Sequence, residues 1–191
     1  MKYKGILSFP VLTQLQRDNK RKLDKDMGIG YSGNLLFPPG DPQIAKIQKE
    51  VEEQIANKFP NGAPKNLTRC FNKYSDKMDP TKAYYKPELA EYYMLAFTDP
   101  SGKYSPEQHL VGVDRLPIID NAVVFPGAVA WVVANIRAYS NPKKQGIGCY
   151  INAAMITNEE PPIGRLDGAP TVEQMFEDCL LYTSPSPRDR Q

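Results

Sequence analysis

The most informative part of the chain is AWVVANIRAYS (residues 130–140), followed directly by NPKKQGIGCYINAAMIT (residues 141–157). β-Branched and aromatic residues fill both segments, and a polar turn with a proline separates them, so together they predict a β-hairpin. Alternate residues of the first strand are small and apolar, which suits the interior of a barrel. This inner face consists of Ala130, Val132, Ala134, Ile136 and Ala138.

The other face of the same strand carries side chains that suit a nucleic acid. It presents Trp131, Val133, Asn135, Arg137 and Tyr139. Aromatic rings give bases a surface on which to stack, and a guanidinium group between them can contact phosphate or stack itself. A second packing layer, or a dimer contact over Trp131, would explain the same residues, so both interpretations stay open.

The turn and the returning strand extend this outer face. Two lysines lie at the turn, and a period of two predicts that Tyr150 and Asn152 face outward while Ile147, Ile151 and Met155 face inward. Lysines that follow phosphates, beside aromatic rings, predict a groove for single-stranded nucleic acid, whereas duplex reading would require a recognition helix that no segment suggests. The predicted DNA-binding residues are Trp131, Asn135, Arg137, Tyr139, Lys143, Lys144 and Tyr150.

Further strands are predicted on both sides of the hairpin. We expect them at residues 2–12, 92–98 and 110–113, and we interpret NLLFPPG (residues 34–40) as a strand followed by a turn. The 18 prolines are spread along the chain and argue against a bundle of long helices. Several strands with little helix predict a small barrel or sandwich.

One amphipathic helix interrupts this pattern. Asp41 can cap it, Phe59 and Pro60 end it, and its apolar residues recur at helical spacing. These are Ile44, Ile47, Val51 and Ile55. The following residues 61–86 are polar and irregular, with basic and aromatic residues interleaved, which suits either nucleic-acid contacts or a solvated loop.

Charge is divided unevenly along the chain. The 191 residues have room for one ordinary domain, 41% of them are hydrophobic, and the formal net charge is only +2. Through Lys86 there are 16 Lys+Arg against 9 Asp+Glu, and from Pro87 onward there are 8 against 13. The acidic end includes Glu173, Glu177 and Asp178, which either keep the protein soluble or mimic DNA and dock partner proteins.

Several classes of function lack the residues that they need. His109, in a strand-like run, is the only histidine, and Cys70, Cys149 and Cys179 have no paired C-x-x-C spacing, so no metal centre and no cofactor are expected. GIGYSG (residues 28–33) matches a dinucleotide-binding pattern, but a charged loop precedes it and a strand follows it. No segment has the length of a membrane span or the shape of a signal peptide, which predicts a cytoplasmic protein.

Three segments, in this order, resemble the small phage single-stranded DNA-binding proteins with an OB-fold barrel. They are KPELAEYYMLAFT (86–98), GVDRLPIIDNAVVFPG (112–127) and VANIRAYSNPKKQGIGCYINAAMI (133–156), and an acidic end follows them. Within them, the motifs P-I-x-D, F-P-G and A-Y-x-N…K-x-G-I are moderately specific together and weak singly. The similarity extends over roughly residues 28–178.

The resemblance implies an all-β fold, namely a five-stranded Greek-key OB barrel with one inserted amphipathic helix and a flexible C-terminal tail. It implies non-enzymatic, sequence-independent binding of single-stranded DNA in phage replication and recombination, in the host cytoplasm, with frequent dimerisation. It also implies that the acidic tail contacts the phage DNA polymerase and helicase/primase. Arg137, Tyr139 and Lys144 are the DNA-binding residues that it supports, whereas Trp131 rests on strand geometry.

Three regions are expected along the chain. Residues 1–158 would form the OB-fold domain and residues 159–178 the acidic flexible region. CLLYTSPSPRDRQ (residues 179–191) resembles translated sequencing-adapter read-through, so we expect it to be a non-native tail.

Two other functions remain as alternatives. A metal-dependent phage nuclease would need acidic metal ligands, for which Asp99, Asp114 and Asp120 are the candidates. A protein-interaction or virion subunit would use Trp131 as a protein contact and would bind no DNA.

Overall fold

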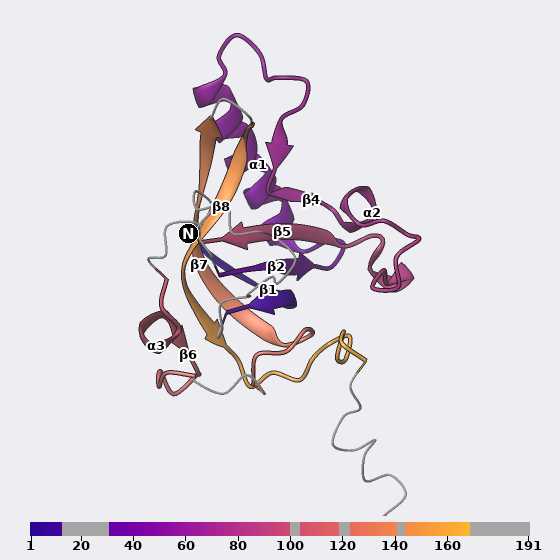
Figure 1. Ribbon diagram of the computed structural model, residues 1–191, viewed down its shortest axis with the longest axis vertical. Coiled ribbons are helices and arrows are strands. Elements are labelled where there is room, and N and C mark those ends of the chain that lie inside the picture. Colours follow the sequence, from indigo (N-terminus) through magenta and orange to yellow (C-terminus); the bar gives the residue numbers. More distant parts are fainter. Residues whose placement is uncertain (13–30, 100–103, 119–122, 141–143, 169–191) are drawn as a thin grey trace, which may run out of the picture.

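The computed structural model describes residues 1–12, 31–99, 104–118, 123–140 and 144–168. Two long strands, β7 and β8, form the hairpin, and α1 is the one long helix among the described residues (Figure 1). The elements are β1 (Lys2–Val11), β2 (Ser32–Phe37), α1 (Pro42–Lys58), β3 (Thr68–Arg69), β4 (Phe71–Lys73), α2 (Tyr74–Lys77), η1 (Pro87–Leu89), β5 (Tyr93–Thr98), α3 (Pro106–His109), β6 (Leu110–Val111), β7 (Val129–Ser140) and β8 (Gln145–Ile156).

Five of the strands close into a barrel. β1 pairs with β2 and with β7, β2 pairs with β5, and β7 pairs with β8, all antiparallel. The parallel pairing of β5 with β8 closes the ring, and the short strands β3, β4 and β6 add to its edges. This is the predicted OB-type barrel, so the fold class is confirmed.

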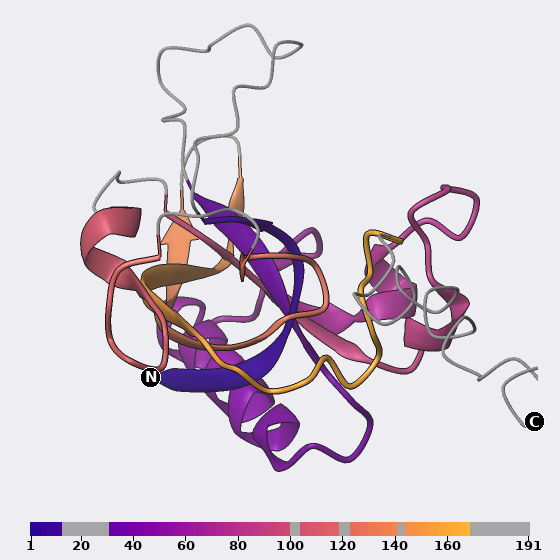
Figure 2. The same cartoon turned by 90° about the horizontal axis from the view of Figure 1, so that it is seen from below.

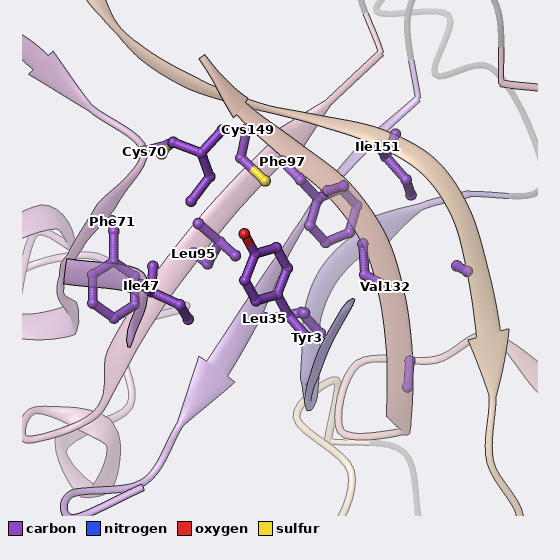
Figure 3. Packing of buried hydrophobic residues seen from close by; sticks show 14 of the residues in the cluster. Tyr3, Leu35, Ile47, Cys70, Phe71, Leu95, Phe97, Val132, Cys149 and Ile151 are labelled. Atoms are coloured by element: carbon purple, nitrogen blue, oxygen red, sulfur yellow. The ribbon is translucent and has the colours of Figure 1, made fainter. Parts of the chain in front are cut away.

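Small and branched apolar residues fill the barrel, as the alternation in β7 predicts. Ala130, Val132 and Ala134 are fully buried, and the neighbouring strands contribute a row in which Leu35 lies between Leu7 and Leu95. Figure 3 shows how side chains from β1, β2, β5, β7, β8 and α1 meet in this core.

The helix α1 begins and ends where the sequence predicts, and it packs against the barrel. The Asp41 carboxylate accepts a hydrogen bond from the Gln43 amide at 2.8 Å, which caps the helix. Three of the four predicted apolar residues are buried, and Ile44 is partly buried. The hydroxyl of Tyr3 in β1 donates to Glu50 of α1 at 2.8 Å, a charge-assisted bond worth about 1.5–3 kcal/mol.

Two details of the predicted strands are wrong. Asn152 lies where the register of β8 against β7 shifts, so it forms a bulge and the facing of residues reverses after it. Met155 therefore faces outward opposite Trp131, whereas Ala154 and Ile156 are buried. The expected strand at residues 110–113 is only Leu110–Val111.

Hydrogen bonding, local at His109 and between distant strands in residues 61–86, explains two further corrections. His109 is the last residue of the helical turn α3 rather than part of a strand, and its Nδ1 lies 3.0 Å from the Ser105 amide. Residues 61–86 are not simply irregular, because β3 and β4 lie within them and pair with β8 and β5. In the part of the chain that is described, no helix is long and apolar enough to cross a membrane.

Residues 157–168 run back over the outside of the barrel towards the segment that holds α2 and η1 (Figure 2). Ile163 and Leu166 pack against a second apolar cluster that includes Ile6, Leu36 and Tyr74. The described part of the predicted acidic region therefore lies against the barrel, whereas residues 169–178 lie outside the described residues.

The two cysteines of the core give a testable expectation. Burial raises the pKa of the Cys70 thiol to about 12 and that of Cys149 well above its ordinary value, and the thiolate is the reactive form. In a Cys179→Ser variant, we expect neither thiol to react with Ellman's reagent in the folded protein, and both to react after denaturation. Rapid modification of the folded variant would contradict this packing.

Candidate nucleic-acid interface

The outer face of the β7–β8 hairpin presents most of the predicted binding residues. Along this face Asn135 lies opposite Tyr150, Arg137 opposite Gly148, and Tyr139 opposite Gly146. The residues between them on β7 point into the barrel and are buried or partly buried. The predicted division of β7 into two faces is therefore confirmed.

Two glycines make room for the two tyrosine rings. A Cβ atom at Gly146 would lie 2.6 Å from the Tyr139 hydroxyl oxygen, and one at Gly148 would lie 2.8 Å from that of Tyr150. Each ring therefore lies directly over a glycine of β8. We call Tyr139, Tyr150, Gly146 and Gly148 the tyrosine platform.

The platform has a positive neighbour. Burial raises the pKa of Tyr150, the nearby Tyr139 raises it further, and Arg137 lowers it, so these three side chains lie within electrostatic range of one another. The raised pKa keeps the Tyr150 phenol neutral near pH 7, whereas the Arg137 guanidinium carries a positive charge. Exposed Arg137 and Lys144 can thus attract phosphates beside the tyrosine platform.

The outward face continues from the hairpin across the barrel. Tyr150 in β8 has Thr98 of β5 beside it, Thr98 lies opposite Ser32 of β2, and Ser32 lies opposite Val11 of β1. OB-type barrels bind oligonucleotides on the outside of their second and third strands, which correspond here to β2 and β5. The tyrosine platform therefore borders the face on which such barrels bind ligands.

Trp131 lies apart from the platform. It is eight residues from Tyr139 along β7, roughly 26 Å at about 3.3 Å per residue. The Lys4 ammonium lies 5.9 Å from the centre of the partly buried Trp131 ring, and it also forms an ion pair with Glu159 at 2.6 Å.

The predicted residues Lys143, Glu173, Glu177 and Asp178 lie outside the described part of the chain.

Asn135 and Arg137 also line a groove that lies between β7 and α1. It has a volume of about 590 Å³, and α1 forms its opposite wall with Glu50, Gln54 and Lys58. Since Arg137 borders this groove as well as the platform, a ligand on the platform can extend towards it.

The residues proposed for a nuclease have structural partners. Buried Asp99 accepts a hydrogen bond from the Tyr104 amide at 2.8 Å, and Asp114 accepts one from the Leu116 amide at 3.0 Å. Asp120 lies outside the described residues, and within them no three His, Cys, Asp or Glu side chains are grouped to hold a metal ion. Gly33 of the dinucleotide-like pattern lies in strand β2.

No protein-family model and no curated protein matches this chain. Among solved structures, it is similar to the single-stranded DNA-binding protein from bacteriophage Enc34 in complex with ssDNA, at 16% identity and a TM-score of 0.60, over 84% of this chain and 88% of that one. The Enc34 protein alone gives a TM-score of 0.59 at 16% identity, over 92% of this chain and 88% of that one.

A second phage protein has the same architecture. This is gp2.5, a single-stranded DNA-binding protein encoded by bacteriophage T7, with 14% identity and a TM-score of 0.54 over 93% of each chain. These similarities cover 84–93% of this chain. The chain therefore has the fold of these phage single-stranded DNA-binding proteins.

Proposed function

We propose that the protein binds single-stranded DNA without sequence preference and serves phage DNA replication and recombination. The observation that supports this most directly is the tyrosine platform beside Arg137. Stacking on an aromatic ring accepts any base and is worth about 1–3 kcal/mol per base. The fold shared with the Enc34 and T7 proteins gives further support.

In this proposal the protein binds and catalyses no reaction. Two bases stack on Tyr139 and Tyr150, while Arg137, Lys143 and Lys144 contact phosphates. Asn135 borders the same surface, and Trp131 would be reached only by a longer strand. The acidic residues Glu173, Glu177 and Asp178 would bind the phage polymerase and helicase/primase, and the protein would act as a dimer.

Titration of fluorescein-labelled oligo-dT, followed by anisotropy, tests the proposal. We expect strong binding at low salt that weakens steeply, with a slope of log K against log salt of about −0.7 per phosphate contacted. Arg137→Ala should make this slope less steep by about 0.7, because one phosphate contact is lost. Arg115→Ala is the matched control, since Arg115 is exposed in the turn after β6, and β6 pairs with residues 154–155 of β8, at the opposite end of the hairpin from the tyrosine platform.

Three results of this titration would contradict the proposal. Lack of binding at low salt would favour the protein-interaction alternative, and cleavage of the oligonucleotide with added Mg²⁺ would favour the nuclease. An unchanged slope in Arg137→Ala would place the DNA on another face. The fluorescence of Trp131, the one tryptophan, should stay constant with short oligonucleotides because it lies far from the platform.

A further inference from the structure

Two exposed aromatic side chains meet on the outside of the barrel, away from the tyrosine platform. Phe9 of β1 and Tyr84 of the segment between α2 and η1 are 46% and 49% exposed. Their ring centres are 5.8 Å apart and their planes are nearly perpendicular, at 87°. Large aromatic side chains are usually buried, so a pair exposed together indicates a surface that binds something.

The backbone holds Phe9 outward. Its φ is +48°, a left-handed conformation that is unfavourable for a bulky residue, and the register of β1 against β2 is irregular between Ser8 and Val11. A non-glycine residue held in this region is strained, and such residues cluster at ligand-binding and other functional sites. The strained backbone at Phe9 therefore supports a functional role for its exposed ring.

A groove of about 570 Å³ lies beside Phe9. Among the described residues that line it, none carries a charge. Asn34 contributes a carboxamide whose Nδ2 donates to the Ser8 carbonyl at a long 3.4 Å, which leaves further donor and acceptor capacity for a ligand. The remaining walls include Val11, Ser32, Ala96 and Pro126.

We propose that this groove, with Phe9 and Tyr84, binds a nucleobase of the bound single strand. This inference rests on the proposed function and adds a second base-binding site to it. A neutral, mostly apolar groove beside two rings suits the flat face of a base and does not suit a phosphate, which would need a cation. The amide of Asn34 and the hydroxyl of Ser32 can bond to the edge of the base.

The groove is continuous with the tyrosine platform. Val11 and Ser32 line the groove and also belong to the outward row that continues through Thr98 to Tyr150. This row crosses three strand spacings, about 14 Å at roughly 4.8 Å each. One DNA strand of sufficient length can therefore occupy both sites, whereas a very short one cannot.

The test compares two oligonucleotides at the ends of the range of about 4–16 nucleotides that one OB barrel covers, (dT)4 and (dT)16. Phe9→Gly removes the ring and suits the positive φ, so the variant should fold; Tyr84→Ala removes the other ring. We expect each variant to bind (dT)16 about 5- to 150-fold more weakly than the wild-type protein, with unchanged affinity for (dT)4.

Matched variants make the result specific. Phe9→Tyr keeps a ring and should retain affinity for (dT)16. Leu116→Ala removes an even more exposed apolar side chain, in the turn after β6 and outside the lining of the groove, and should change nothing. If the wild-type protein binds (dT)16 and both ring-deleted variants bind it equally well, the second site is wrong and the proposed function stands. Equal losses for (dT)4 and (dT)16 would also overturn a separate site. No binding by the wild-type protein would overturn both proposals.

Discussion

Replacing Tyr139 and Tyr150 together by alanine is expected to weaken the binding of (dT)16 by about 30-fold or more. This oligonucleotide has the upper length of the range of about 4–16 nucleotides that one OB barrel covers. Each ring that stacks on a base contributes about 1–3 kcal/mol, so two rings contribute about 2–6 kcal/mol if their effects add. Because the rings are neighbours over Gly146 and Gly148, their effects are coupled, so we expect a loss of binding free energy near the lower end of that range. Anisotropy titrations at one fixed low salt concentration measure the change.

The matched control is the double variant Tyr139→Phe/Tyr150→Phe. It removes both hydroxyls and keeps both rings, so stacking and affinity should be retained. Neither tyrosine belongs to the buried core, and the thermal unfolding temperature of the alanine variant should therefore stay close to that of the wild-type protein. A folded alanine variant that binds (dT)16 with wild-type affinity would show that the platform is not the binding surface.

Local patterns were sufficient to predict the faces of β7 and the limits of the helix, whereas the choice of an OB barrel over a sandwich came from the resemblance to phage single-stranded DNA-binding proteins. The alternation in residues 130–140 predicts the two faces of β7 because this strand pairs with β1 and β8 and has one face in the core. Residues that point into the core are therefore small and apolar, and those that point outward are not. The limits of α1 follow from Asp41, which caps it, and Phe59, at which it ends. Both signals depend on residues close together in sequence.

The errors arise where distant residues determine the structure. The bulge at Asn152 depends on the pairing of β8 with β7, and no residue pattern within β8 predicts it. β3 and β4 are two and three residues long, too short to show an alternating pattern, and they are recognised only by their pairing with β8 and β5. The positions of the two tyrosine rings could not be predicted without knowing which glycines lie beneath them. The G-x-G pattern of residues 146–148 in the returning strand was the one signal in the sequence.

Two of the basic residues between positions 61 and 86 form ion pairs. Arg69 pairs with Glu52 of α1, and Lys73 pairs with Glu91 at 2.8 Å. The aromatic residues interleaved with them include Phe71 and Tyr74, and both are buried. These four residues of the segment 61–86 therefore have structural partners, whereas exposed Tyr84 of the same segment belongs to the proposed second site.

Gly127→Ala is expected to cause the largest loss of stability, lowering the free energy of unfolding by about 2–6 kcal/mol. Gly127 has φ +110°, where a residue with a side chain is strained by about 1–3 kcal/mol. An added Cβ would also overlap the carbonyl oxygen of Gly164 and lie 3.2 Å from the Arg165 Cα, and such crowding costs about 1–3 kcal/mol more. Urea denaturation of both proteins measures the difference.

Gly62→Ala is the control that separates strain from crowding. Gly62 has almost the same φ, +109°, but no heavy atom other than those of its chain neighbours lies within 4 Å of the position of an added Cβ. Its variant should lose only the strain, about 1–3 kcal/mol. The excess loss in Gly127→Ala then reports how tightly residues 163–166 are held against the barrel by contacts such as Arg165 over the Phe125 ring, at 4.2 Å. Equal losses in the two variants would mean that this segment moves aside freely, and that its packing contributes little to the fold.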